Sequence, residues 1–339
     1  MKRSASPAPR HASFGFSLIE LMIALVLGLL LIAGALSIFL AAREAFRVTE
    51  DLSRVQESGR VAFDLLARDV REAGGNHCAN AVRVANVVSG RDSPYWQNWA
   101  NSFKGFDGSD AFTAPSFGFG GAASERVAAT DALEVHSSED LGMYVSEAMT
   151  SSQADFKVNA VPSDVKANDV LMVCDFRLVS LFKATGVGAA SISHGVGASG
   201  NCSGGFSRDL SLLCKDDALI PAAAWHLYGA NAVISRPRSI RWFIGNNDSG
   251  GTSLYRAVIY PGGIQPGADE VAEGVTGMAL TYISEGETGY RAAAGVADWS
   301  KVKAVRVELT LQSQRKVGVD HQPLNRTVST VLALRNRNL

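Results

Sequence analysis

The chain has 339 residues, of which 47% are hydrophobic and 19% are charged, and its formal net charge is −1. A chain of this length and composition can bury a substantial core, so it is not an intrinsically disordered protein. The near-zero net charge and the scattered basic residues argue against nucleic-acid binding. Thirty-three glycines, many of them clustered after residue 74, indicate frequent turns and a β-rich body.

Residues 18–42 are almost entirely apolar, and Glu20 is the one charged residue among them. At about 1.5 Å per residue, a helix of this length exceeds the roughly 30 Å hydrocarbon core of a bilayer, so we expect one membrane-spanning helix. Lys2, Arg3 and Arg10 precede it, with no acidic residue in the first fifteen positions. The positive-inside rule therefore predicts a cytoplasmic N-terminus and an exported body, periplasmic or extracellular.

A cleaved secretory signal and a plain uncleaved anchor are two alternative interpretations of this segment. A secretory signal has an apolar region of about 7–15 residues that ends at an A-x-A-like site. Here the AGA stretch at 33–35 lies inside the apolar run. A plain anchor does not account for Glu20, because a carboxylate at mid-membrane costs about 2.5–3.5 kcal/mol, and less near the end. A Glu20 that stays protonated near the interface, or reaches the headgroups, is a further alternative.

Glu20 gains an opposite charge nearby if the chain is cut between Gly15 and Phe16, because the cut creates an α-ammonium group. Two opposite charges attract more strongly in a low-dielectric medium than in water. The stretch GFSLIE at 15–20, between a short basic leader and the apolar run, resembles the class III signal of type IV pilins and type II secretion pseudopilins. This resemblance implies that a prepilin peptidase removes residues 1–15 and N-methylates Phe16. It also implies that Glu20 pairs with the N-terminal amine of a neighbouring subunit.

An amphipathic helix continues directly from the apolar segment. Apolar side chains recur at spacings of three and four up to Ala73, and the glycine pair at 74–75 is a typical helix end. We therefore expect one long helix from Phe16 to Ala73. The expected divisions of the chain are a leader at 1–15, a membrane half of the helix at 16–42, an amphipathic half at 43–74 and a globular domain at 75–339.

Short runs rich in β-branched and aromatic residues predict strands in the body. The clearest alternation of apolar and polar residues, VKAVRVELTL at 302–311, indicates a half-buried strand. We expect a pilin-like α+β fold, with the long helix packed on a mainly antiparallel β-rich body. The predicted strands are Ala81–Val88, Ala132–His136, Val170–Cys174, Ser239–Ile244, Ser253–Ile259, Ala279–Ile283, Val302–Gln312 and Thr327–Arg335.

Short blocks outside the signal resemble the PilW-type minor pilins. They are QESGR at 56–60, LLARDVR at 65–71, DVLMVCD at 169–175, LYR at 254–256, VAEGV at 271–275, VKAVR at 302–306 and LRNR at 334–337. The blocks at the helix end partly recur in the J-type minor pseudopilins of type II secretion. The resemblance implies a structural assembly factor and not an enzyme.

A PilW-type protein is expected to join other minor pilins in the inner membrane, to prime pilus assembly and to be incorporated in the pilus or at its tip. It would then support pilus-dependent motility or adhesion. The implied partners are the prepilin peptidase, other minor pilins, the major pilin, a tip adhesin and inner-membrane lipid. Two other interpretations stay open: a minor pseudopilin J at the tip of a type II secretion pseudopilus, and a membrane-anchored periplasmic enzyme or binding protein.

Four cysteines lie in the exported part of the chain, where disulfides form: Cys78, Cys174, Cys202 and Cys214. Their even number predicts two disulfides, for which three pairings exist. We favour Cys78 with Cys174 and Cys202 with Cys214, although spacing does not fix the connectivity. There is no C-x-x-C motif, which argues against a metal site.

The sequence contains no recognisable G-x-S-x-G, H-E-x-x-H or phosphate-loop motif, and we expect no catalytic site, cofactor or metal. The stretches at 107–110 and 246–250 resemble calcium-binding loops, but such runs are more typical of plain turns. Aromatic residues cluster at 95–99 and 224–228. These clusters either dock partner pilins or fill the core under loops.

Overall fold

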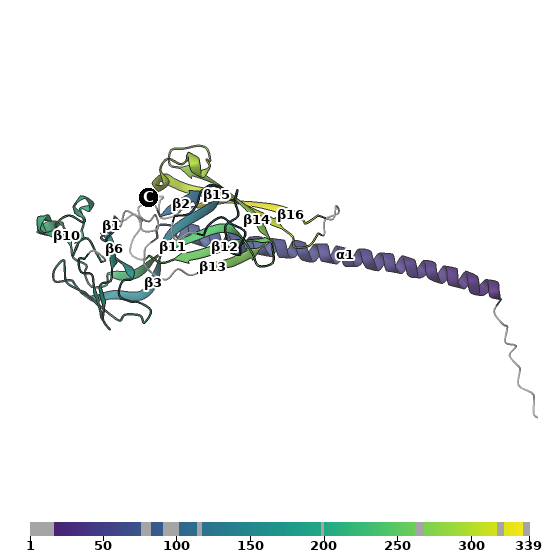
Figure 1. Ribbon diagram of the computed structural model, residues 1–339, viewed down its shortest axis with the longest axis horizontal. Helices are drawn as coiled ribbons and strands as arrows, with labels where there is room; N and C mark the ends of the chain where they lie inside the picture. Colours follow the sequence, from purple (N-terminus) through teal and green to yellow (C-terminus); the bar gives the residue numbers. More distant parts are fainter. Residues whose placement is uncertain are drawn as a thin grey trace, which may run out of the picture.

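The computed structural model describes residues 17–75, 83–90, 102–113, 117–197, 200–261, 267–316 and 322–334. One continuous helix, α1 (Leu18–Arg71), projects far beyond a β-rich body (Figure 1). With 54 residues, α1 is about 81 Å long at 1.5 Å per residue. The expected α+β fold, a long N-terminal helix followed by a mostly antiparallel body, is confirmed.

The helix ends at Arg71, two residues before the predicted end at Ala73, and the chain then turns at Gly74. Gly74 has a φ of +72°, and its backbone N–H donates to the carbonyl oxygen of His136, with an N–O distance of 2.9 Å. A Cβ atom at this position would lie 2.7 Å from the Ser102 hydroxyl oxygen. Glycine is therefore needed here both for its left-handed conformation and for the close approach to its neighbour.

The body contains one large sheet and one three-stranded sheet. The large sheet has the order β1-β6-β5-β11-β3-β4-β8-β7, with β12 and β13 added beside β11 and β2 added beside β3. Its strands are β1 (Val84–Asn86), β2 (Phe103–Phe106), β3 (Ala132–Glu147), β4 (Phe156–Val158), β5 (Val170–Cys174), β6 (Val179–Lys183), β7 (Gly186–Val187), β8 (Ser191–Ser193), β11 (Val233–Asn246), β12 (Thr252–Ile259) and β13 (Ala268–Glu273). Only β1 and β6 pair in parallel among these described strands.

The smaller elements complete the body. The three-stranded antiparallel sheet has the order β14-β15-β16, and a separate two-stranded ribbon joins β9 to β10. Their bounds are β14 (Val275–Ser284), β15 (Val302–Gln312), β16 (Asn325–Ala333), β9 (Phe206–Ser207) and β10 (Trp225–His226). Short 3-10 helices lie at η3 (Leu210–Leu212), η4 (Asp217–Leu219), η5 (Ala222–Ala224), η6 (Ala293–Gly295) and η7 (Trp299–Lys301).

Each predicted strand overlaps an observed one, although residues 81–82 and 335 lie outside the described part of the chain. The prediction for β11 starts six residues too late, since the observed strand begins at Val233. It includes Pro237, although proline is unfavourable inside a strand. The structure resolves this conflict: β5 pairs with β11 up to Ser235 and β12 pairs from Ser239, so Pro237 lies between these two partners. Several short strands, among them β2, β4, β6 and β13, were not predicted.

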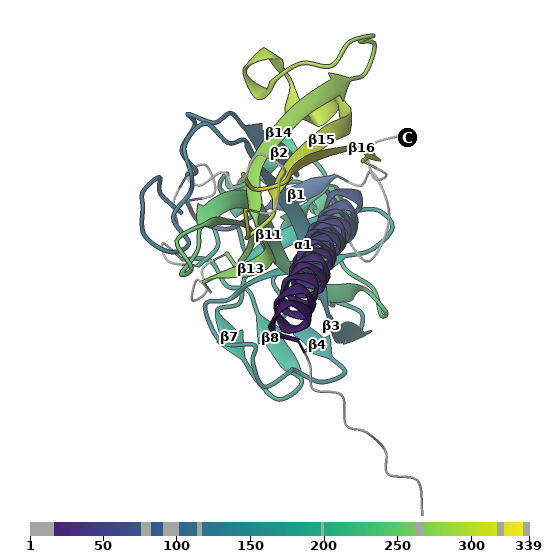
Figure 2. The ribbon, with the colours of Figure 1, turned by 90° about the vertical axis from the view of Figure 1, so that its right-hand side faces the viewer.

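The C-terminal part of α1, from Asp51 to Arg71, is part of the main core, and we call it the lower half. Figure 2, a view nearly along α1, shows the three-stranded sheet and the large sheet on different sides of the helix. Val55, Ala62, Leu66 and Val70 are buried against both sheets, which confirms the predicted apolar stripe from residue 55 onward. A Cβ atom at Gly59 would lie 3.3 Å from a methyl carbon of Leu311, so the small residue allows α1 to approach β15 closely.

A buried carboxylate attaches α1 to the large sheet. Oδ2 of Asp69 accepts hydrogen bonds from Nε1 of Trp242 at 2.9 Å and from Nε of Arg256 at 2.7 Å. Its Oδ1 accepts from Nη2 of Arg256 at 3.2 Å, so the ion pair is bidentate. Burial lowers the pKa of Arg256, but the hydrogen bond and charge of Asp69 raise it more, and the net shift is upward. One helix residue thereby contacts both β11 and β12.

A second buried network lies within the large sheet. Nε of Arg241 donates to Oε2 of Glu134 at 3.0 Å, and Nε2 of His136 lies 3.2 Å from Oε1 of the same carboxylate. All three side chains are fully buried. Burial raises the pKa of Glu134, but the hydrogen bond from His136 and the charge of Arg241 outweigh burial, and the net shift is downward. This network contributes stability only while Glu134 is ionised.

Asp69→Ala should destabilise the protein by about 3–5 kcal/mol, because it leaves the Arg256 guanidinium and the Trp242 N–H without their buried partner. Denaturant unfolding of the detergent-solubilised full chain, followed by tryptophan fluorescence, measures this loss. Asp64→Ala is the matched control, since Asp64 is 77% exposed on the same helix and should change stability by less than about 0.5 kcal/mol. Equal stabilities of the two variants would contradict the role assigned to Asp69.

Glu134→Gln should destabilise the protein at neutral pH, and the difference from wild type should shrink in acid. The pKa of Glu134 is lower in the folded state than its ordinary value of 4.5, so the stabilisation is fully present above that pH. It is lost as the pH falls through the lower folded-state value. Urea unfolding of both proteins between pH 3 and 7 tests this, and a difference that stays constant with pH would contradict it.

Candidate functional site

The N-terminal part of α1, from Leu18 to Phe46, exposes its large apolar side chains, and we call it the upper half. Leu18 and Leu31 are each 76% exposed and Phe39 is 64% exposed, and Figure 1 shows this half projecting away from the body. The helix is long and apolar enough to cross a membrane by length and composition, and none of its most apolar window is buried in the chain itself. These side chains therefore require lipid or other helices as partners.

Glu20 lies at the free end of this helix and forms a capping box with Ser17. The Ser17 hydroxyl oxygen accepts from the backbone N–H of Ile19 at 3.4 Å, and Oε2 of Glu20 accepts from the backbone N–H of Ser17 at 3.0 Å. Sequence reasoning missed this role, although the S-x-x-E pattern at 17–20, directly before an apolar run, is its signature. Glu20 therefore satisfies one backbone donor at the start of its own helix in the isolated chain.

The predicted processing site lies next to this cap. Gly15 and Phe16 are outside the described residues, so cleavage after Gly15 and the pairing of Glu20 with an N-terminal amine stay predictions. Cleavage there would place the new amine one residue before Ser17, whose N–H already contacts the Glu20 carboxylate.

The structure contains a disulfide between Cys202 and Cys214, whose Cα atoms are 4.8 Å apart. Cys174 is also in a disulfide, whereas Cys78, the partner favoured for it, lies outside the described residues. The backbone N–H of Cys202 donates to the carbonyl oxygen of Val87 at 2.7 Å. The Cys202–Cys214 bond therefore closes the loop that contains β9 and η3, and the Cys202 N–H holds this loop against the segment that follows β1.

The two stretches that resemble calcium loops form structural turns. The Asp107 carboxylate accepts from the backbone N–H groups of Ala293 and Ala294, at 3.1 and 2.9 Å, and thus holds the loop against η6. Oδ1 of Asn247 accepts from the Gly251 N–H at 2.8 Å and from the Ser249 hydroxyl at 2.9 Å. Among the described residues there is no group of three or more His, Cys, Asp or Glu that could hold a metal ion.

The aromatic cluster at 224–228 contributes mainly to the core. Tyr228 is fully buried, and its hydroxyl donates to Oγ of Ser180 at 2.8 Å. His226 is 5% exposed and its ring lies 4.6 Å from the Tyr228 ring, whereas Leu227 between them is 45% exposed. The other predicted cluster, at 95–99, lies outside the described residues.

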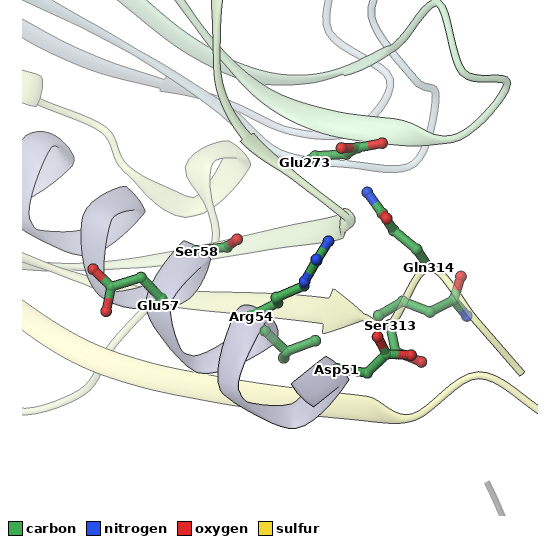
Figure 3. Close-up of a pocket in the computed structure, with 9 residues that line it drawn as sticks. Asp51, Arg54, Glu57, Ser58, Glu273, Ser313 and Gln314 are labelled. Atoms are coloured by element: carbon green, nitrogen blue, oxygen red, sulfur yellow. The ribbon is translucent and has the colours of Figure 1, made fainter. Parts of the chain in front are cut away.

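A polar groove of about 330 Å³ lies at the neck, where α1 leaves the body (Figure 3). We call it the neck groove. Figure 3 shows the helix residues Asp51, Arg54 and Ser58 on one side and Glu273 and Gln314 on the other, with Glu57 directed away from them. Its full lining is Asp51, Arg54, Val55, Glu57, Ser58, Glu273, Gln312, Ser313 and Gln314.

Sequence reasoning also missed the neck groove. Asp51 is only 4% exposed and stands four residues before Val55, in line with the apolar stripe of α1. A carboxylate at a stripe position is the signal that could have identified it, because such a position normally holds an apolar residue. Asp69, three residues after buried Leu66, follows the same rule.

Comparisons with known proteins match both ends of the chain. The prokaryotic N-terminal methylation motif matches residues 10–36, which include Gly15, Phe16 and Glu20. The family described as type IV pilus-assembly protein W (PilW) matches residues 241–336, from within β11 to beyond β16. Neither a curated protein nor a solved structure gives a significant match. Together with the long apolar helix and the antiparallel body, these two matches support the assignment of the chain as a PilW-type minor pilin.

Proposed function

We propose that the protein helps to prime type IV pilus assembly and is incorporated in the pilus or at its tip, where it supports motility or adhesion. The observation that carries this proposal is the division of α1 into two halves. One half exposes an apolar surface that begins at Glu20, and the other half is fixed in the core of the body by Asp69. A neighbouring helix that packs on the exposed half thereby positions the whole body.

Before assembly, the exposed half of α1 spans the inner membrane. The apolar helix and the methylation motif fit a pilin anchored in that membrane. The basic residues of the leader keep the N-terminus in the cytoplasm, and the body is exported. A prepilin peptidase removes residues 1–15 and methylates Phe16. The subunit then leaves the lipid and packs against the other minor pilins, the major pilin and a tip adhesin.

Glu20 directs this packing through its charge. Among the described residues its cap occupies only Oε2, so Oε1 is available to the N-terminal ammonium of a neighbouring subunit. Both charges are unfavourable alone in an apolar environment, and they attract strongly when they meet there. A neighbour in the wrong register leaves both charges unpaired, so the pair selects one register.

The PilW family is structural and not enzymatic, and we propose that this chain has no catalytic activity of its own. A minor pseudopilin J of type II secretion would share the helix and the signal, but the PilW match in the body favours the pilus. An anchored periplasmic enzyme or binding protein would need Glu20 only as a helix cap. The three functions therefore predict different losses in a Glu20 variant: loss of pili, loss of secretion, or neither.

A deletion strain complemented with Glu20 variants tests the function. Glu20→Gln keeps a capping box, because glutamine also serves at this position, but it removes the charge. We expect Glu20→Gln and Glu20→Ala to reduce surface pili strongly and to leave secreted enzymes at the wild-type level. Ser17→Ala, which removes the serine cap and keeps the charge, should retain pili.

Pili counted by electron microscopy and secreted enzymes assayed in the same cultures give the readout. Wild-type pilus numbers in Glu20→Gln would show that the carboxylate serves only as a cap. Normal pili with failed secretion in the deletion strain would assign the protein to the pseudopilus. If both pili and secretion are normal, the anchored-enzyme function is favoured.

The mature protein should begin at an N-methylated Phe16. Mass spectrometry of the N-terminal peptide from purified membranes, in cells that contain and that lack the prepilin peptidase, measures this directly. A form that begins at Met1 in both strains would contradict the processing step.

A further inference from the structure

The neck groove is lined by Asp51, and one buried oxygen of this carboxylate has no partner within the described part of the chain. Asp51 is 4% exposed, and among the described residues its Oδ2 accepts no hydrogen bond. Its Oδ1 lies 3.8 Å from Nη1 of Arg315, a long ion pair in which the arginine side chain is 48% exposed. A buried carboxylate oxygen without a partner is unfavourable, so a bound hydrogen-bond donor would lower the free energy of the chain here.

The charges around the groove favour a cation. Two carboxylates face it, on Asp51 and Glu273, while Glu57 is directed away. The guanidinium of Arg54 is in the lining, and that of Arg315 is only loosely paired with Oδ1 of Asp51. The Arg54 guanidinium is already engaged, because its Nη2 donates to Oε1 of Glu50 at 2.9 Å. A lipid phosphate is disfavoured by this lining, and the described residues offer no group of three ligands for a metal ion. A single ammonium or guanidinium group matches the unused oxygen of Asp51.

The size and position of the groove indicate where such a cation comes from. Its volume of about 330 Å³ is at the lower limit of small-molecule pockets, about 300–1,000 Å³, and fits one long side chain. Asp51 lies nine residues beyond Ala42, the expected end of the membrane segment, or about 14 Å along the helix. Phe46, between these two residues, is 71% exposed and offers an apolar surface to a parallel helix.

We propose that the neck groove is a docking site for a lysine or arginine side chain of a neighbouring pilin subunit. The basic side chain enters the groove and donates to Oδ2 of Asp51, and the side chains that cover this oxygen in the isolated chain move aside as the neighbouring helix packs beside the neck. This inference rests on the proposed function as a pilus subunit. The contact adds a second charge pair about thirty residues after Glu20 along the helix. The two pairs together fix both the register and the rotation of the neighbouring subunit.

Asp51→Asn tests the proposal, because it removes the charge with little change in shape. Co-purification of the other minor pilins with the full-length protein from detergent-solubilised membranes should fall by about tenfold or more, as expected for the loss of one member of a buried charge pair. Asp64→Asn is the matched control. It removes the same charge from the same helix at a side chain that is 77% exposed, and it should leave co-purification unchanged.

A second readout separates docking from a structural role. Since one Asp51 oxygen has no partner in the part of the chain that the structure describes, the melting temperature of purified Asp51→Asn should equal or exceed that of wild type. Asp51→Leu, which continues the apolar stripe, should also be at least as stable and should also lose the partners. A lower melting temperature in both variants would assign Asp51 a structural role and overturn the proposal.

Cross-linking identifies the partner. A photoreactive amino acid at Ser58, on the rim of the groove, should cross-link the full chain in membranes to another pilin. The cross-linked peptide should contain a lysine or arginine within one helical turn of the attachment point. Cross-links to lipid alone, or to a peptide without a basic residue, would contradict the proposed occupant.

Glu20→Gln, examined in parallel, separates this inference from the function on which it rests. If Asp51→Asn retains the other minor pilins at the wild-type level while Glu20→Gln loses them, the docking site alone is overturned. Wild-type co-purification and normal pili in both variants overturn the proposed function as well.

Discussion

The buried contact of Asp69 with Trp242 and Arg256 holds the molecule together as one unit. It places a carboxylate of α1 between two residues of adjacent strands, inside a core formed by the helix and both sheets. Withdrawal of the helix would expose this core and would leave an arginine and an indole N–H without their acceptor. The lower half of α1 is therefore part of the body, and a force on the upper half is transmitted to it.

The upper half of α1 is unsatisfied in the isolated chain. Its apolar side chains are exposed, and one carboxylate oxygen of Asp51 at the neck has no hydrogen-bond partner among the described residues. Within the described residues, Glu20 at the free end is satisfied only by its own helix cap. All three features lie on one helix, and contact with other subunits can satisfy all of them. A subunit built in this way is suited to assembly.

The body has two large hydrophobic cores. The PilW match, residues 241–336, coincides with the strands that hold α1, including Trp242, Arg256 and the three-stranded sheet. A second core, with Phe156, Phe206 and Tyr228, lies around the short strands and the Cys202–Cys214 disulfide. Its β10 lies at the end of the body opposite the free end of α1 (Figure 1). The helix-holding part is thus the one shared with the family.

The sequence alone determined the long helix, the positions of the main strands and the signal around Glu20, because these depend on local periodicity and spacing. It did not determine the full length of β11, since its continuation through Pro237 depends on where β5 and β12 end. Nor did it reveal the roles of Asp51 and Asp69. Their positions in the apolar stripe indicate burial but not partners. Only tertiary packing decided that Asp69 gains two partners, while one oxygen of Asp51 has none among the described residues.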